Sequence, residues 1–81
     1  MVHTDYCYIT MWEDGEIREV YLKRKNAEEK VIRILHENFV DYKDMSFERV
    51  KEICERFNYD PVNLGFGFLE YPIGDLIENL T

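Results

Sequence analysis

The chain has 81 residues, a length that fits one domain and that buries roughly 60–65% of the unfolded surface in a single core. Hydrophobic residues make up 46% of the sequence and charged residues 33%, which is typical of a globular protein and argues against a disordered chain. The net charge of −7 repels nucleic-acid phosphates and favours a partner with a basic surface.

The sequence favours an intracellular, cytoplasmic protein that does not span a membrane, and host cytoplasm if the protein is viral. No apolar run approaches the about 18 residues of a membrane span, and residues 1–5 lack the basic and apolar regions of a signal peptide. Cys7 and Cys54 allow at most one disulfide, whereas a secreted chain of this size usually carries a denser set. We therefore expect reduced thiols.

The first predicted element is a β-hairpin. Residues 6–12 and 17–23 are β-prone runs on either side of Asp14-Gly15, a dipeptide typical of a two-residue type I′ turn because both central positions need positive φ. With these two residues as the loop, the predicted register pairs Trp12 with Ile17, Ile9 with Val20, Tyr8 with Tyr21, and Cys7 with Leu22.

This register divides the hairpin side chains between two faces. One face is aliphatic and is expected to be the core face beneath the helices; it carries Cys7, Ile9, Met11, Val20 and Leu22. The other is amphipathic and rich in aromatic residues; it carries Tyr6, Tyr8, Trp12, Ile17 and Tyr21, together with Thr10, Glu19 and Lys23. We expect the C-terminal helix or a partner subunit to cover this aromatic face.

Two helices are predicted after the hairpin. Asn26 and Glu29 have the spacing of a capping box, which predicts a helix from there to about Tyr42 with an apolar stripe wide enough to contact two elements. Ser46 is the predicted N-cap of a second helix, which ends at Asn58. The expected buried face of the second helix consists of Phe47, Val50, Ile53, Cys54 and Phe57.

A third strand and a short C-terminal helix complete the prediction. Residues 65–71 are expected to form the strand, in which Gly65 and Gly67 allow a close backbone approach or a bulge, and Pro72 ends it. Beyond it, Ile73, Leu76, Ile77 and Leu80 recur at helical spacing. The predicted fold is a single α+β domain over residues 1–81, in the order β-β-α-α-β-α, with the two-helix segment packed on the sheet.

No motif indicates catalysis, a cofactor or a metal ion. The available ligands His3, Cys7, His36 and Cys54 contain no pair with the spacing of a zinc site. Ser46 is explained as a helix cap and Cys54 as a core residue, so neither is expected to be a nucleophile. The Gly65-x-Gly67 segment lacks the third glycine and the Lys-Ser/Thr ending of a phosphate loop. We expect a non-catalytic protein.

Acidic residues concentrate at the hairpin tip and at the end of the first predicted helix, a set that we call the acidic edge: Glu13, Asp14, Glu16, Glu37, Asp41 and Asp44. The C-terminus of a helix prefers cations, so the last three are locally unfavourable, and such conflicts are expected at functional sites. Rows of carboxylates can imitate the phosphates of a duplex. By analogy of size and charge with phage and viral inhibitors, the leading hypothesis is an inhibitor or regulator that binds a basic surface of a larger nucleic-acid-handling protein; simple acidic solubility is the alternative interpretation.

Two further function hypotheses stay open. The aromatic face, with Tyr6, Tyr8, Trp12 and Tyr21, could form a protein-interaction or homodimerisation surface. The Lys23-Arg24-Lys25 segment could serve a small enzyme or a nucleic-acid binder, because residues 18–33 hold six of the ten basic residues. The acidic charge of the rest of the chain disfavours nucleic acid as a partner.

Overall fold

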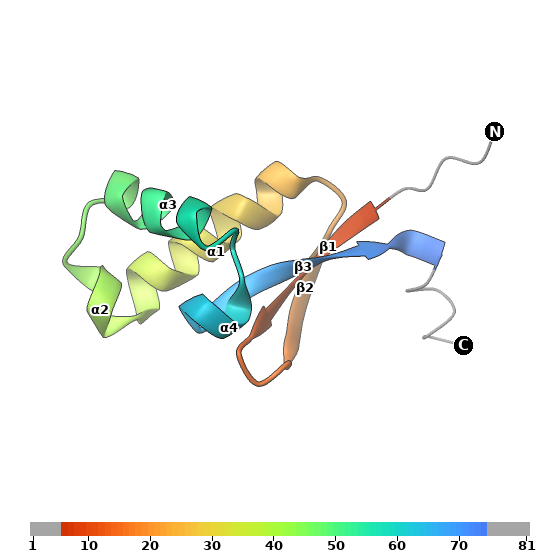
Figure 1. Cartoon of the computed structure of the whole chain (residues 1–81), viewed down its shortest axis with the longest axis horizontal. Coiled ribbons are helices and arrows are strands. Elements are labelled where there is room, and N and C mark those ends of the chain that lie inside the picture. The colour runs from red at the N-terminus through yellow and green to blue at the C-terminus, as the bar shows by residue number, and fades with distance from the viewer. Residues whose placement is uncertain (1–5, 75–81) are drawn as a thin grey trace.

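A three-stranded antiparallel sheet and four helices make up the computed structural model, which describes residues 6–74 (Figure 1). The strands are β1 (Tyr6–Trp12), β2 (Ile17–Tyr21) and β3 (Phe66–Pro72), in the order β2-β1-β3. The helices are α1 (Arg24–Asn38), α2 (Val40–Lys43), α3 (Phe47–Arg56) and α4 (Pro61–Leu64). The predicted α+β fold, with its N-terminal hairpin and with helices between the second and third strands, is confirmed.

The hairpin turns where it was predicted to, but with a three-residue loop. The Gly15 N–H donates to the Trp12 carbonyl at 2.9 Å, and the Trp12 N–H donates to the Glu16 carbonyl at 3.2 Å. Gly15 has a left-handed φ of 87°, whereas Asp14 does not have a positive φ. The predicted type I′ turn is therefore wrong, and the geometry is that of a longer loop closed by a left-handed glycine.

A β-bulge compensates for the extra loop residue. Met11 lies opposite Ile17, so the predicted pairing of Trp12 with Ile17 is wrong. The register then shifts between Thr10 and Met11, because Arg18 is an additional residue on β2. Beyond this shift, the predicted pairs of Tyr8 with Tyr21 and of Ile9 with Val20 are confirmed.

The helices cover the aromatic face of the sheet, not the aliphatic one, which corrects the predicted core face. The main core contains the buried residues Ala27, Val31, Ile32, Leu35, Val50, Cys54, Tyr59, Leu64, Phe66 and Phe68, and the partly buried Tyr8, Trp12 and Tyr21 pack against it. Strand β3 explains the choice, because Phe66 and Phe68 pair with Trp12 and Thr10 and so join their face. Large aromatic side chains bury the most apolar area under a helix layer. Cys7, Ile9 and Met11 form a separate cluster on the opposite face.

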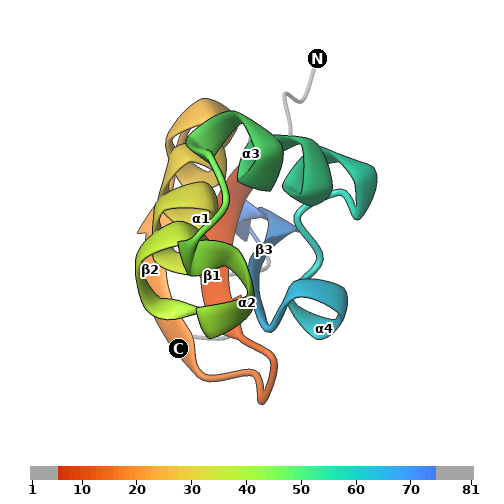
Figure 2. The ribbon, with the colours of Figure 1, turned by 90° about the vertical axis from the view of Figure 1, so that its left-hand side faces the viewer.

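Helix α1 begins two residues before the predicted capping box and ends before the predicted end. Its N-cap is Lys23, which makes no side-chain cap hydrogen bond, and Asn26 lies inside the helix, so the capping box is wrong. Tertiary contacts at the first turn outweigh the local capping preference. The helix breaks at Phe39, whose φ of −103° and ψ of 123° are extended, and α2 follows. Figure 2, an end-on view, shows α1 beside the sheet with α3 packed next to it.

Helix α3 begins as predicted, whereas α4 was not predicted. The Ser46 hydroxyl accepts a hydrogen bond from the Arg49 N–H at 3.2 Å, which confirms the N-cap. Asn58 is left-handed, with a φ of 52°. Asp60 caps α4 ahead of Pro61 at its first position, a local signal of Asp followed by Pro that is typical of a helix start. The predicted C-terminal helix falls outside the described residues, apart from a helical backbone at residues 73–74.

Candidate functional site

The first group of the acidic edge lies at the hairpin tip. Glu13, Asp14 and Glu16 are all exposed. The Asp14 carboxylate accepts a hydrogen bond from the Glu16 N–H at 2.8 Å, which stabilises the turn. The Glu13 N–H donates to the Gly65 carbonyl at 3.0 Å and so ties the tip to the end of α4. The three carboxylates are therefore presented from a loop that is anchored to the body of the protein.

The second group follows the break after α1. Glu37 lies near the end of α1, Asp41 in the first turn of α2, and Asp44 caps the end of α2, and all three are exposed. The break at Phe39 places Asp41 at the beginning of a helix, where a carboxylate is favoured, so the expected conflict with the helix dipole does not apply to this residue. It remains for Glu37 and Asp44, which lie at the C-terminal ends of α1 and α2.

An aromatic contact connects the two groups. Phe39, between α1 and α2, stacks on Trp12 with ring centroids 5.8 Å apart, and Trp12 directly precedes the hairpin tip. An open hollow of about 440 Å³ lies between these rings and the tip, and is lined by Trp12, Glu13, Asp14, Glu16, Arg18, Phe39 and Gly65. The structure thus gathers the three tip carboxylates around one hollow, and Phe39 in its wall lies between Glu37 and Asp41 in the sequence. The unusual width of the first predicted apolar stripe was the one signal in the sequence for this position of Phe39.

Most of the acidic edge carries charge without a partner. The salt bridges within residues 6–74 join Arg18 to Glu16, Arg24 to Glu28, Lys30 to Glu19 and Arg49 to Glu52. Of the acidic edge, only Glu16 belongs to these pairs, at 3.7 Å from Arg18. In the described part of the chain, the other five carboxylates make no ion pair within 4.0 Å. Their field therefore acts outward, into solvent.

The aromatic residues singled out from the sequence mostly face the interior. Tyr8 packs edge-to-face on Phe68 at 5.6 Å, and Trp12 packs on Phe66 at 4.8 Å in addition to Phe39. Burial, followed by a hydrogen bond from its hydroxyl to the Glu19 carboxylate, raises the pKa of Tyr21 to about 12. Tyr6 alone of the four is exposed, at 45%. Their cover is helical, with α1 in contact with β1 and β2 and α4 in contact with β1, which corrects the expectation of a C-terminal helix or a partner subunit.

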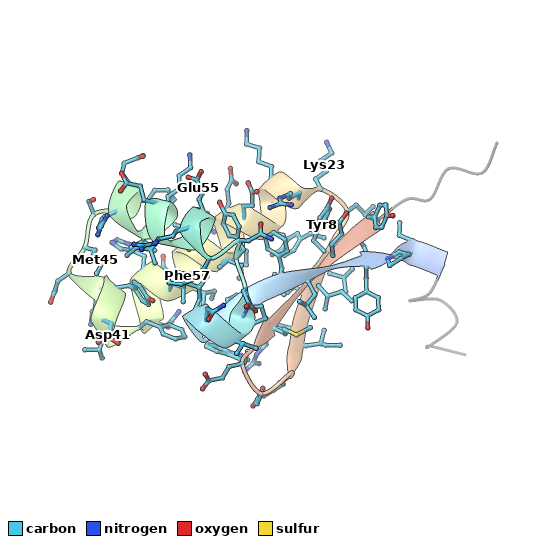
Figure 3. All side chains as sticks on the ribbon, in the orientation of Figure 1. Tyr8, Lys23, Asp41, Met45, Glu55 and Phe57 are labelled. Carbon is cyan, nitrogen blue, oxygen red and sulfur yellow. The ribbon has the colours of Figure 1, made fainter. Side chains whose placement is uncertain are left out.

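The basic segment is engaged in structural contacts at its centre. The Arg24 guanidinium lies 2.8 Å from the Glu28 carboxylate, donates to the Asn58 side chain at 3.0 Å, and lies over the ring of Phe68 at 5.4 Å. Lys23 and Asp41 lie near opposite ends of α1, as Figure 3 shows. Next to this segment, a groove of about 490 Å³ between α1 and α3 is lined by Lys25, Glu28, Glu29, Ile32, Arg33, Phe47, Lys51 and Tyr59. Its charges are of both signs, so it favours neither an anion nor a cation.

The nucleophile and ligand candidates occupy structural positions. Both Cys7 and Cys54 are free and buried. Burial raises the pKa of the Cys54 thiol to about 12, so a reactive thiolate is disfavoured there. His36 Nε2 lies 2.7 Å from the Met45 carbonyl, which holds the loop after α2. Within residues 6–74, no group of three or more His, Cys, Asp or Glu side chains could hold a metal ion.

No helix in the described part of the chain is long and apolar enough to cross a membrane. Comparison with protein-family models, with curated proteins and with solved structures finds no significant match to this chain.

Proposed function

We propose that this protein is a non-catalytic inhibitor or regulator that binds a basic surface of a larger nucleic-acid-handling protein through its acidic edge. One observation carries the proposal: six exposed carboxylates lie at the hairpin tip and at the ends of α1 and α2, and five of them make no ion pair among residues 6–74. A protein surface that binds nucleic acid displays spaced cations, and an anionic edge attracts it by the same electrostatics. The cytoplasm is the proposed compartment, since two free thiols fit a reducing environment.

The hollow at the hairpin tip offers a specific contact for such a partner. Its walls are the rings of Trp12 and Phe39, and its rim carries three carboxylates. Arg18 of this chain already lies over the Trp12 ring, at 5.5 Å from its centroid, while 3.7 Å from Glu16. Aromatic faces next to carboxylates attract guanidinium and ammonium groups. A lysine or arginine of the partner is therefore the side chain that we expect in this hollow.

The other two hypotheses receive less support. The aromatic face is occupied by contacts to the helices, apart from Tyr6. Arg24, at the centre of the basic segment, uses its guanidinium within the fold, and Lys30 pairs with Glu19 at 3.1 Å. An anion arriving at this segment would meet fewer available cations than the sequence suggests.

The test compares two variants that lose the same charge. The first, E13Q/D14N/E16Q, neutralises the hairpin tip and keeps an acceptor oxygen at Asp14 for the turn. The control, E48Q/E52Q/E55Q, neutralises three exposed carboxylates on α3. Affinity capture from the native host with the unaltered protein identifies the partner, and titration calorimetry then measures Kd for the three proteins at low and at physiological ionic strength.

We expect the tip variant to bind about tenfold more weakly, since three rim charge pairs of about 0.5 kcal/mol each sum to about 1.5 kcal/mol. Its affinity should also depend less on salt, because fewer ion pairs form. The α3 variant should retain its affinity. Equal losses of affinity in both variants would show that the partner responds to the net charge of the protein and not to the acidic edge. Unchanged affinity of the tip variant would refute the proposal.

A further inference from the structure

The face of the sheet opposite α1 is apolar in all three strands. We call it the aliphatic sheet face; in the described residues it comprises Cys7, Ile9, Met11, Ile17, Val20, Gly67, Leu69 and Tyr71. Cross-strand pairing arranges them in rows, such as Val20, Ile9 and Leu69 across β2, β1 and β3. No member of the set is charged, although the chain as a whole carries a charge of −7.

Exposure on this face differs sharply between the central strand and the edges. Ile9 and Met11 are 2% and 9% exposed, whereas Ile17, Val20 and Leu69 are 57%, 48% and 41% exposed. Cys7, Ile9 and Met11 form the central cluster of this face, and the partly buried side chains among residues 6–74 that pack against it are Tyr71 and Ile73. Both lie toward the Cys7 end of the strand, because Cys7 pairs with Tyr71. At the other end, Met11 is flanked by Gly67, against which the Tyr59–Pro61 backbone packs, and by the exposed Ile17. The apolar area left exposed on this face therefore lies on the edge strands, at Ile17, Val20 and Leu69, and a further apolar layer would bury it.

The chain itself leads onto this face. After β3 the backbone turns helical at residues 73–74, and Ile73 already touches the central cluster. Leu76, Ile77 and Leu80 follow Ile73 at the i+3, i+4 and i+7 spacing of one helix face, while Asp75, Glu78 and Asn79 fall on the other side. A helix over residues 73–81 would be about 13 Å long, and the four residue steps from Cys7 to Met11 span about 13 Å of strand.

We propose that the aliphatic sheet face is the docking surface for residues 75–81 of the same chain, with Leu76, Ile77 and Leu80 in contact with β1 and its neighbours. The segment is tethered at Gly74, so its local concentration at the face is in the millimolar range for so short a connection. A second copy would have to bring another seven negative charges to the same place. The tethered segment is therefore the favoured occupant.

Cys7 reports on this contact, and Cys54 supplies an internal reference. Cys7 lies on the central strand of the aliphatic sheet face, at the end nearest Gly74, and is 1% exposed, and Cys54 is buried in the main core at 0%. We would measure iodoacetamide alkylation of each thiol by mass spectrometry in the full chain and in L76S/L80S. The matched control is Asn79→Ser, on the polar side of the segment.

Alkylation of Cys7 should become at least about tenfold faster in L76S/L80S, with Cys54 and the control unchanged. An unchanged Cys7 rate would overturn the proposal. Protection of Cys7 that weakens on dilution, together with a dimer mass in sedimentation, would also overturn it, because a second copy would then be the cover.

Nuclear Overhauser contacts in the unaltered protein give a second measurement that does not depend on a variant folding. The proposal requires contacts from the methyl groups of Leu76, Ile77 or Leu80 to those of Ile9 or Val20. Their absence in a protein whose other methyl contacts are observed would refute it, even if L76S/L80S proved too unstable for alkylation.

Discussion

Replacing Gly67 by alanine tests the closest backbone contact of the fold. An added Cβ would overlap the Tyr59 carbonyl oxygen and would lie 2.5 Å from the Pro61 nitrogen and 2.8 Å from the Asp60 carbonyl carbon. These are backbone atoms, so no change of rotamer relieves the overlap. Since Gly67 does not have a left-handed φ, the expected effect comes from space alone. The segment that leads into α4 must move away from β3.

The size of the effect follows from the contacts that this movement breaks. The Phe68 N–H donates to the Tyr59 carbonyl at 2.9 Å, and a buried group left unpaired costs about 1–3 kcal/mol. Overpacking adds about 1–3 kcal/mol. Gly67→Ala should therefore lower the free energy of unfolding by about 2–6 kcal/mol, a large part of the about 5–15 kcal/mol of a typical domain.

Urea unfolding, followed by Trp12 fluorescence and far-ultraviolet circular dichroism, measures this loss. With a slope of about 1–2 kcal/mol per molar urea, the midpoint should fall by about 1 M or more. Gly74→Ala is the matched control, because nothing lies within 4 Å of a Cβ added there. A loss below about 1 kcal/mol in Gly67→Ala would show that the Tyr59–Pro61 segment yields easily, and would refute the reasoning.

Three other predictions concern stability. Ser46→Ala should cost about 1 kcal/mol by removing the N-cap of α3, whereas Ser46→Asp should not, and urea unfolding distinguishes them. Arg24→Lys should lower the free energy of unfolding by about 0.5–1 kcal/mol, because an ammonium cannot reach Glu28 and Asn58 while covering Phe68. Loss of this effect in an E28Q background would confirm that Arg24 and Glu28 are coupled. Burial raises the pKa of the Cys54 thiol from 9.0 to about 12. The protonated thiol therefore contributes its full stabilisation of the fold below pH 9. This stabilisation is lost as the pH rises toward 12, by up to about 1.4 kcal/mol per pH unit. Unfolding of Cys54→Ala should show a shallower alkaline decline, and an identical slope would contradict this assignment.

Local chemistry made several elements predictable. The position of the hairpin followed from Asp14-Gly15 between two β-prone runs, and the start of α3 followed from Ser46. The close backbone approach at Gly67 was one of two expected uses of the glycine, and it is confirmed. In each case a few neighbouring residues determine the backbone, without help from distant parts of the chain.

The choice of core face could not be predicted from the hairpin alone. It depends on Phe66 and Phe68, which lie more than fifty residues from β1 in the sequence and join its aromatic face only through pairing with β3. The break after α1 likewise depends on a contact between residues far apart in the sequence, because Phe39 leaves the helix to stack on Trp12. For the acidic edge, composition identified the six carboxylates, but the grouping of the three at the hairpin tip around one hollow depends on that same contact.

The bulge at Arg18 has a consequence for which surfaces of the hairpin carry charge. A two-residue loop without a bulge preserves the pairs from Tyr8 to Thr10, but it places Arg18 opposite Met11. With the longer loop and the bulge, Ile17 takes that place, and the guanidinium lies over Trp12 instead. Two loop lengths are therefore compatible with one ladder, and side-chain chemistry selects between them. Substitution of Arg18 by an aliphatic residue would remove the preference for the three-residue loop. The hairpin tip would then exchange between the three-residue loop with a bulge and the two-residue loop without one.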